Sequence, residues 1–578
     1  MHSDILISRR SLIASAAAAV ALAACGGGSD GNGNGGLGAK LNGGAVASSD
    51  RYSAEAARQI LLAGGNAVDA AVAMAFVLAV TYPEAGNIGG GGFMNVFFNG
   101  KPYFIDYREM APSAATSDMY TRFKDAKGQQ DPLSSLWGAQ AAGVPGTVRG
   151  MWEAHQRFGL LPWKDVVAPA VELADKGHIA SKAEVFWRDY MLQNFSASPY
   201  PANLREYFGS MREGQLFRQP ELAETLRRIG ANGPDEFYQG RTADMIVASM
   251  KQDGGKGIIT KADLANYKAV WRDPLPVAWN GMTVYTAPPP SSGGIALGQL
   301  LGMKAALRDT LFTGEKPNTV QYMHLNAEML KRVFADRAEY LGDPGFVDVP
   351  VARLLDPAYI KARAAEVNPR DITPTASVKP GLAKMHTTHY SVVDKWGNAV
   401  SNTYTLNLAY GCGVIVRGAG FALNSEMDDF ATIPGQPNIF GVIGSDANAV
   451  APGKRPLSSM SPTILVKDGL PTMVIGTPGG SRIFNAVYQV LANTYDHQMP
   501  LAAAVSNRRF HHQLPQGNIM EGEPFSPIPA DLALQLQARG YTVTTNSFDT
   551  DIQAIHITGR DLVSVSDPRG RGLAMVVN

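Results

Sequence analysis

Helical and strand-forming patterns occupy different parts of this chain of 578 residues, and their separation limits the folds open to it. Residues 145–375 are rich in helical signals, for example over 219–228 and 320–340. Residues 387–408 instead alternate β-branched and aromatic side chains with polar ones, as strands do because successive side chains point to opposite faces of a sheet. Runs of helices with separate strand-rich stretches predict an α+β layered architecture.

The alternating segment predicts a β-hairpin. Its two halves flank Lys395-Trp396-Gly397, a connection of three residues with glycine where a left-handed conformation is favoured. If Asp394 pairs with Asn398, Thr387 lies directly opposite Thr405. Directly opposed residues have Cβ atoms about 4.5–5.5 Å apart, close enough for their hydroxyls to interact. Threonine pairs are common in sheets, so this geometry alone also fits an ordinary structural role.

Three other segments carry clear local signals. Residues 53–80 read as helical with a break at 64–66, and Phe93 to Phe98 read as a strand that ends at the turn Asn99-Gly100. Residues 288–294 form a Pro/Ser/Gly loop that opens onto a helix.

Composition excludes several classes of protein. Lys and Arg number 51 and Asp and Glu also 51, so the net charge is zero and a nucleic-acid partner is not expected. The two cysteines, Cys25 and Cys412, exclude a disulfide scaffold and a cysteine-based zinc site. The chain also lacks the G-x-S-x-G, H-E-x-x-H, Walker A and C-x-x-C motifs.

The N-terminus predicts export and a lipid anchor. Arg9-Arg10 resembles a twin-arginine motif, and the apolar stretch 12–24 is too short to span a bilayer but suits a signal peptide. Residues 22–25 resemble a bacterial lipobox, which makes residues 1–25 an export signal with lipidation at Cys25; an ordinary cleavable signal is the alternative. Residues 26–44 hold ten glycines in 19 positions and predict a flexible tether. We therefore expect a bacterial periplasmic or cell-surface lipoprotein held at the membrane through Cys25.

Distinct short motifs follow one another along residues 44–578. The hairpin contains Thr387-Thr388-His389-Tyr390, followed by Asn398-Ala399-Val400. The other motifs are Gly65–Ala71, Asn87–Met94, Asp106–Pro112, Pro288–Gly294, Glu339–Pro344, Met427–Phe430, Lys454–Pro462 and Pro478–Arg482. In this order they resemble the motifs of γ-glutamyltranspeptidases (glutathione hydrolases), which are N-terminal-nucleophile hydrolases, and the hairpin motif is similar to the start of their small subunit.

The resemblance implies a four-layer αββα sandwich built from one precursor that cleaves itself between His386 and Thr387. Residues 45–386 would form the large subunit and residues 387–578 the small catalytic subunit, and the two would stay associated as a heterodimer. Thr387 would supply the nucleophile through its hydroxyl and the base through its new α-amino group, whose pKa is about 7.7–8.0. No cofactor and no metal are implied.

The resemblance also assigns the remaining site residues. Thr405 would orient the Thr387 hydroxyl, and the backbone N–H groups of Gly479 and Gly480 would form an oxyanion hole. The α-carboxylate of a γ-glutamyl substrate would be bound by Arg108, Ser458 and Ser459. Its α-ammonium would be bound by Asn407, Glu426 and Asp429.

The implied reaction is transfer of the γ-glutamyl group from glutathione or another γ-glutamyl compound to water or to an amino acid or dipeptide. Two alternatives stay open: an acylase of the same superfamily acting on glutaryl-cephalosporins or poly-γ-glutamate, and an uncleaved lipoprotein that only binds peptides or glutathione. Asp429 favours glutamyl over glutaryl substrates. Residues 434–455 have the length of a lid loop, with Phe440 where that lid often carries tyrosine.

Overall fold

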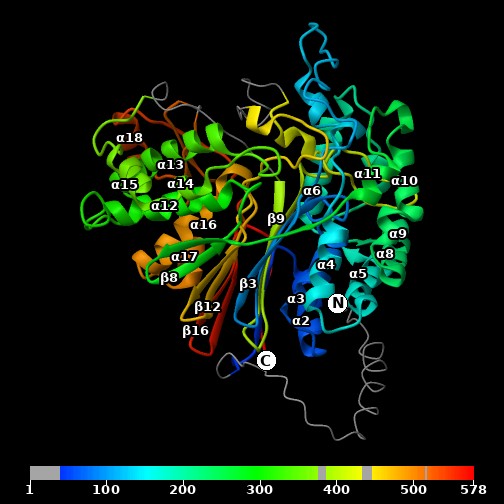
Figure 1. Cartoon of the computed structure of the whole chain (residues 1–578), viewed down its shortest axis with the longest axis horizontal. Coiled ribbons are helices and arrows are strands. Elements are labelled where there is room, and N and C mark those ends of the chain that lie inside the picture. The colour runs from blue at the N-terminus through cyan, green and yellow to red at the C-terminus, as the bar shows by residue number, and fades with distance from the viewer. Residues whose placement is uncertain (1–39, 375–385, 433–445, 515–516) are drawn as a thin grey trace, which may run out of the picture.

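Two stacked β-sheets with helices on both outer faces make up the core of the computed structural model, which describes residues 40–374, 386–432, 446–514 and 517–578 (Figure 1). The first sheet has seven strands. Their spatial order is β18 (Leu573–Val577), β1 (Gly44–Ser48), β9 (His386–Val393), β10 (Ala399–Asn407), β2 (Gly91–Phe98), β3 (Lys101–Tyr107) and β6 (Val270–Arg272).

The second sheet has six strands, all antiparallel to their neighbours. Their order is β17 (Asp561–Ser566), β16 (Gln553–Thr558), β12 (Leu470–Gly476), β11 (Thr463–Lys467), β8 (Met282–Thr286) and β7 (Leu275–Trp279). Side chains of both sheets form a buried cluster between them, including Ala45, Val393, Ile464, Val474 and Ile555. The two sheets therefore pack face to face.

Helices cover the outer face of each sheet. On the first sheet, α3 (Ala67–Thr81) is buried at all 15 positions, as expected of a helix that is apolar on every side. The second sheet packs against α12 (Gly293–Leu307), α13 (Val320–Tyr340) and α16 (Ile483–Leu491) through a separate buried cluster. Helix, sheet, sheet and helix follow one another, which confirms the predicted four-layer αββα sandwich.

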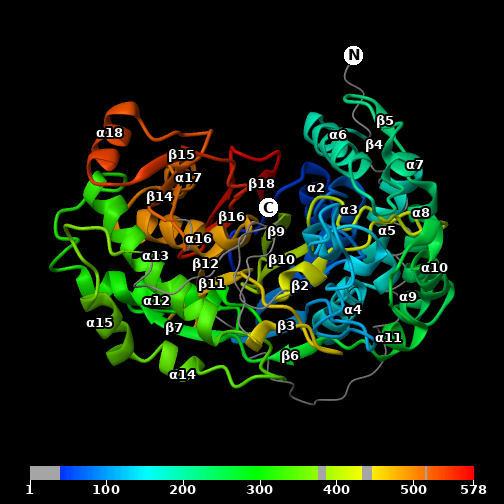
Figure 2. The same ribbon diagram turned by 90° about the horizontal axis from the view of Figure 1, so that it is seen from above.

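The remaining elements surround this core (Figure 2). Beside the first sheet lie α2 (Arg51–Leu62), α4 (Thr147–Phe158), α5 (Trp163–Lys176), α6 (Lys182–Ser196), α7 (Leu204–Phe208), α8 (Pro220–Asn232), α9 (Asp235–Tyr238), α10 (Arg241–Ser249), α11 (Lys261–Asn266) and the strand pair β4 (His178–Ile179) and β5 (Leu216–Phe217). Beside the second lie α14 (Val351–Leu354), α15 (Pro357–Ala365), α17 (Leu501–Ser506), α18 (Ala530–Ala538) and the small sheet of β13 (Phe510–His511), β14 (Ile519–Gly522) and β15 (Thr542–Thr545).

Local sequence signals placed these elements correctly. The predicted helical break separates α2 from α3, where the Asn66 side chain caps α3 and Asp69 completes a capping box. The predicted strand is β2, and Asn99 and Gly100 both adopt positive φ in the turn that follows it. The loop at 288–294 leads into α12 as predicted.

The predicted tether extends too far toward the globular part. Leu41 N–H donates to the Lys395 carbonyl at 3.0 Å, and the Arg560 side chain donates to the Lys40 carbonyl at 2.6 Å. Gly44 already belongs to β1, where it lies opposite Val577 of β18. The glycine-rich composition did not predict these contacts, because Lys40 and Leu41 make them through backbone atoms.

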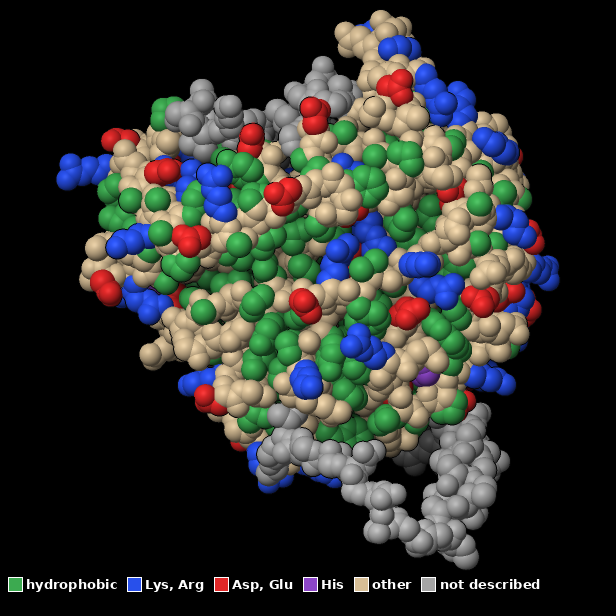
Figure 3. Space-filling view, viewed as in Figure 1, with side chains coloured by type: hydrophobic (Ala, Val, Ile, Leu, Met, Phe, Trp, Pro, Cys, Tyr) green, Lys and Arg blue, Asp and Glu red, His purple; other side chains and the backbone are tan. Residues whose placement is uncertain are grey.

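Basic and acidic side chains are interspersed over the face drawn in Figure 3, in keeping with the zero net charge. In the described part of the chain no helix combines the length and apolar character needed to cross a bilayer. The predicted signal, Cys25 and most of the tether lie outside the described residues, as does Phe440 of the predicted lid.

Candidate active site

The predicted hairpin is formed by β9 and β10, in the predicted register. Asp394 N–H donates to the Asn398 carbonyl at 3.0 Å, and Gly397 adopts φ +84° in the connection. Thr387 lies opposite Thr405. Their hydroxyl oxygens are 3.5 Å apart, and the Thr387 side chain is almost wholly buried. The hairpin thus fixes both hydroxyls at one end of the first sheet.

Arg108 forms the centre of a buried charge cluster. It follows β3, and its guanidinium donates to the carboxylates of Glu426 and Asp429, with Glu109 at 3.5 Å. The guanidinium also donates to the carbonyl of Pro456, two residues before Ser458, at 3.3 Å. The structure therefore brings together the predicted carboxylate-binding arginine and two of the predicted ammonium-binding residues.

The acids of this cluster sit in an unfavourable environment for charge. Burial raises the pKa values of Glu426, Asp429 and Glu109, although Arg108 opposes the rise in each case. Removing one partner from a buried ion pair leaves an uncompensated charge, which costs several kcal/mol. A zwitterionic ligand can replace these pairs with its own, because its carboxylate fits the guanidinium and its ammonium fits the acids.

Asn407 supplies a further acceptor next to the hairpin. It adopts φ +72° at a β-bulge at the end of β10, and its N–H donates to Thr405 Oγ1 at 2.8 Å. Its side-chain nitrogen donates to the Ser425 carbonyl at 2.8 Å, whereas its Oδ1 is buried and accepts no hydrogen bond among the described residues. That oxygen is free to accept from an ammonium group.

Ser458 and Ser459 are held in place by Arg337, a residue that the sequence did not single out. Arg337, in the last turn of α13, donates to Ser292 Oγ at 3.0 Å and to Ser459 Oγ at 3.4 Å. Ser292 in turn donates to the Ser458 carbonyl through its hydroxyl at 2.6 Å. Because a guanidinium is only a donor, Ser459 Oγ must accept from it, and the serine hydrogen can donate to a carboxylate in place of its long contact with Ser292 Oγ at 3.5 Å.

Arg337 and Glu109 are thus functional candidates that the sequence alone did not reveal. Burial lowers the pKa of Arg337 to about 10, so it still carries its charge at neutral pH. The sequence did contain a signal, since Arg337 lies two residues before the family-like motif at 339–344 and Glu109 directly follows Arg108.

The turn at Gly479 and Gly480, the residues predicted to form the oxyanion hole, follows β12. The two residues adopt φ +124° and +59°, where side chains are strained. A Cβ atom on Gly479 would lie 2.6 Å from the Thr550 side chain. Pro478, which precedes this turn, lines one cavity together with Thr387.

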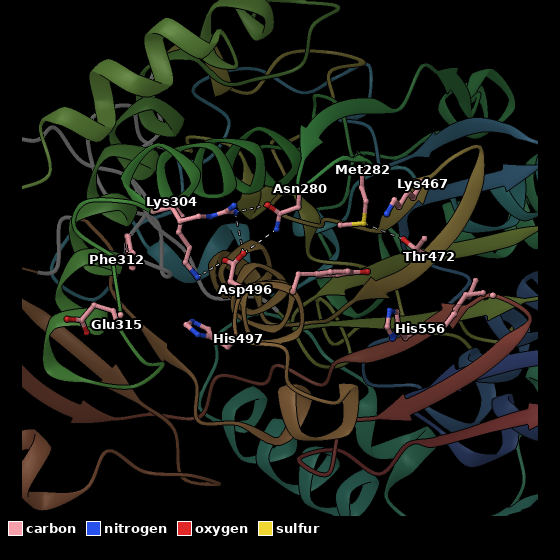
Figure 4. A pocket seen from close by; sticks show the side chains of 16 residues that line it. Asn280, Met282, Lys304, Phe312, Glu315, Lys467, Thr472, Asp496, His497 and His556 are labelled. Carbon is pink, nitrogen blue, oxygen red and sulfur yellow. Dashed lines mark hydrogen bonds and ion pairs between the residues drawn. The ribbon is translucent and has the colours of Figure 1, made fainter.

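Cys412 does not have the environment of a reactive nucleophile. Cys412 is buried, and burial raises the pKa of its thiol to about 12. No cluster of three His, Cys, Asp or Glu side chains suited to a metal ion occurs among the described residues. A larger cavity of about 1030 Å³, lined by Lys304, Asp496 and His556 among others, contains none of the predicted site residues (Figure 4).

The αββα layers place this protein among the N-terminal-nucleophile hydrolases. The crystal structure of a cephalosporin acylase from Bacillus halodurans superposes with a TM-score of 0.81 at 28% identity, covering 95% of this chain and 98% of that one. A γ-glutamyltranspeptidase structure from Pseudomonas nitroreducens is 55% identical, with a TM-score of 0.56, and covers 59% of this chain and 99% of its own.

The family follows from the sequence match. The gamma-glutamyltranspeptidase family model matches residues 53–577. A glutathione hydrolase proenzyme of Pseudomonas aeruginosa is 57% identical over 540 residues, which cover 93% of this chain and 95% of that protein. This chain belongs to the γ-glutamyltranspeptidase family.

Proposed function

We propose that this protein is a γ-glutamyltransferase and glutathione hydrolase whose precursor cleaves itself between His386 and Thr387. The observation that carries the proposal is the placement of Thr387 opposite Thr405, with the buried Arg108 cluster on the same site. The relative from Pseudomonas aeruginosa is named a proenzyme, which supports cleavage of a precursor.

Cleavage would begin when the Thr387 hydroxyl attacks the His386 carbonyl, giving an ester that water then hydrolyses. The cut frees the α-amino group of Thr387, which is a base of suitable strength near neutral pH. Residues 45–386 and 387–578 would become the large and small subunits of a heterodimer. In support, the Pseudomonas nitroreducens chain covers 59% of this one. Residues 45–386 are 342 of the 578 residues, also 59%, so that chain has the relative length expected of a large subunit.

In turnover, Thr387 Oγ1 would attack the γ-carbonyl of the substrate while the α-amino group takes its proton. The N–H groups of Gly479 and Gly480 would stabilise the oxyanion. The ester formed on Thr387 would pass its γ-glutamyl group to water or to the amine of an amino acid or dipeptide. Arg108, Ser458 and Ser459 would bind the α-carboxylate, and Asn407, Glu426 and Asp429 the α-ammonium.

An acylase for glutaryl amides is the second candidate, because a cephalosporin acylase shares the fold. The buried acids at 426 and 429 and the free Asn407 Oδ1 favour a substrate with an ammonium group, which glutaryl compounds lack. Rates with γ-glutamyl and glutaryl anilides separate the two functions. We expect the γ-glutamyl anilide to be turned over faster, and a preference for the glutaryl compound would overturn the proposal.

We also propose export as a lipoprotein anchored at Cys25, on the strength of the twin-arginine-like and lipobox-like segments. The intact mass of membrane-extracted protein tests this proposal. A large subunit that begins at a diacylated Cys25 is expected, and an unmodified N-terminus would contradict the anchor.

A further inference from the structure

The cavity of about 1030 Å³ lies on the helical side of the second sheet, beside the C-terminal ends of α12 and α16 (Figure 4). Its volume is that of a site for a small molecule. None of the residues predicted to bind or transform the γ-glutamyl substrate lines it. A ligand in this cavity would therefore be a second ligand, bound apart from the substrate.

Two cations share one acid in the wall of this cavity. The Asp496 carboxylate lies 2.8 Å from the buried Lys304 ammonium and 3.5 Å from Arg308 Nη2. The same Nη2 donates to Asn280 Oδ1 at 2.6 Å. Arg308 is half-exposed, and its Nε and Nη1 groups donate to no described residue. The wall thus has positive charge and hydrogen-bond donors that remain available to a ligand.

The other charged residues of the lining leave an excess of cations. Lys467 is exposed and Glu315 is partly buried, and neither has an oppositely charged partner within 4 Å among the described residues. Three cations therefore face two acids. The Glu315 carboxylate accepts from the Thr319 hydroxyl at 2.8 Å, and in Figure 4 it points away from Asp496. This distribution favours an anion beside Arg308, because a guanidinium suits carboxylate and phosphate oxygens.

Apolar side chains border the space next to these charges. Met282, Phe312 and Tyr495 line the cavity, and the Tyr495 ring packs edge-on against His556 with ring centres 6.0 Å apart. Burial lowers the pKa of His556 and of His497, which also lines the cavity, so both histidines are neutral at pH 7. A flat apolar group attached to the anion would contact these side chains.

Two helices connect this cavity with the predicted active site. α12 begins directly after Ser292, whose hydroxyl donates to the Ser458 carbonyl, and it carries Lys304 in its last turn. α16 begins three residues after Gly480 and ends in a π-helical turn, Ala492–Asp496, a type of turn that is frequent at functional sites. The two helices pack against each other, and the 15 residues of α12 make it about 22 Å long. A ligand in the cavity would contact the far ends of both.

We propose that this cavity is an effector site for small anions, carboxylates or phosphate monoesters, that carry an aromatic or other flat apolar group. The anion accepts from Arg308 Nε and Nη1, which draws the guanidinium away from Asp496 and leaves that acid to Lys304. Because Asp496 lies at the end of the turn that follows α16, its shift moves the helix that begins at the Gly479-Gly480 turn. The effect on turnover rests on the proposed function, whereas binding of the anion does not.

The test combines binding and turnover in one set of conditions. Calorimetric titration of the purified mature protein at pH 8 measures binding of phenyl phosphate and of phenylacetate, which distinguishes a phosphate ester from a carboxylate. Inorganic phosphate is the probe without a ring. Release of p-nitroaniline from γ-glutamyl p-nitroanilide gives kcat and KM over the same range of anion concentrations.

We expect both aromatic anions to bind, with phenyl phosphate the tighter because its two charges face three cations. Inorganic phosphate should bind at least about threefold more weakly than phenyl phosphate, since it lacks the ring contacts. Arg308→Gln should weaken binding at least about tenfold through loss of charge-assisted hydrogen bonds, and the exposed Lys467→Gln about threefold. The matched control is Arg353→Gln, an exposed arginine outside the cavity.

Saturating phenyl phosphate should change kcat/KM of the unmodified protein at least about twofold, with its midpoint at the calorimetric Kd. The same change in Arg308→Gln should require about tenfold more anion. Coupling between two sites is a free energy, so the two measurements have to agree.

The outcomes separate the effector site from the proposed function. The effector site is wrong if neither anion binds, or if Arg308→Gln binds both as tightly as the unmodified protein does. It is also wrong if binding depends on Arg308 but leaves kcat and KM unchanged, or if the anion raises KM equally in Arg308→Gln, which would place it on Arg108. If no p-nitroaniline is released by a correctly cleaved protein, the proposed function fails, and calorimetry still decides whether the cavity binds the anion.

Discussion

Thr387 and Thr405 face each other across the hairpin of β9 and β10, with hydroxyl oxygens 3.5 Å apart. Thr405 Oγ1 also accepts the Asn407 N–H at 2.8 Å. This contact fixes the Thr405 oxygen as an acceptor near the hydroxyl that has to attack. The strand register, a backbone property, thereby determines the position of the nucleophile.

Replacing Thr387 with alanine should abolish both precursor cleavage and activity, because the variant lacks the attacking oxygen. Denaturing electrophoresis and an assay with glutathione measure the two effects. Thr388→Ala is the matched control, since this neighbour is buried and its hydroxyl has no hydrogen-bond partner among the described residues. A Thr387→Ala protein that still separates into two chains would show that another group cleaves the bond.

Thr405→Ala should slow both cleavage and turnover by about tenfold, in line with the loss of one oriented hydrogen bond. Thr405→Ser keeps the oxygen and should retain most of the rate. The time course of cleavage in purified precursor gives the first rate, and kcat of the mature protein gives the second. Equal rates for the alanine variant and the unmodified protein would remove Thr405 from the mechanism.

Asp429→Asn should raise KM for a γ-glutamyl anilide by about tenfold or more, because a hydrogen bond to a charged group is lost. The same change should leave KM for a glutaryl anilide within about twofold, since that substrate has no ammonium for the acid to bind. A parallel rise in both KM values would indicate that Asp429 supports the structure of the site but does not bind the substrate ammonium group.

Arg337→Gln should raise KM for γ-glutamyl anilide several-fold while kcat changes little, because Ser459 loses the donor that fixes its hydroxyl. Arg337→Lys should recover part of the affinity through its charge, although an ammonium lacks the guanidinium fork. A fall in kcat with KM unchanged would contradict a role in carboxylate binding.

The buried Asp428 predicts a pH dependence of stability. Burial raises its pKa from 3.8 to about 8. Between these values the unfolded chain gives up the proton while the folded protein keeps it, so the free energy of unfolding falls as pH rises. Asp428→Asn should therefore gain at least about 1 kcal/mol relative to the unmodified protein between pH 5 and pH 8.

Denaturant unfolding at the two pH values measures this gain, with Asp309→Asn as an exposed control. If the difference between Asp428→Asn and the unmodified protein is the same at pH 5 and pH 8, the shifted titration of Asp428 is excluded.

The sequence predicted the parts of the site that local pattern controls. Alternation and turn chemistry were enough to pair Thr387 with Thr405, because a hairpin's register follows from its connection. The layered α+β architecture likewise followed from separated helical and strand patterns, and resemblance to a family supplied the four layers.

Contacts across long sequence separations were not predictable in the same way. Arg108 meets Glu426 and Asp429 across more than 300 residues, and Arg337 reaches Ser459 from α13, which is 122 residues away in the sequence. Such pairs form because burial of a charge requires a partner, and the partner is chosen by tertiary packing.

The central claim is that Thr387 becomes a chain terminus and then carries the glutamyl group. Mass spectrometry of protein quenched in acid during turnover of γ-glutamyl p-nitroanilide tests both parts directly. We predict a fragment of residues 387–578 together with the same fragment heavier by one glutamyl group, located at Thr387 by fragmentation. An uncleaved chain, or a glutamyl group on any other residue, would contradict the account.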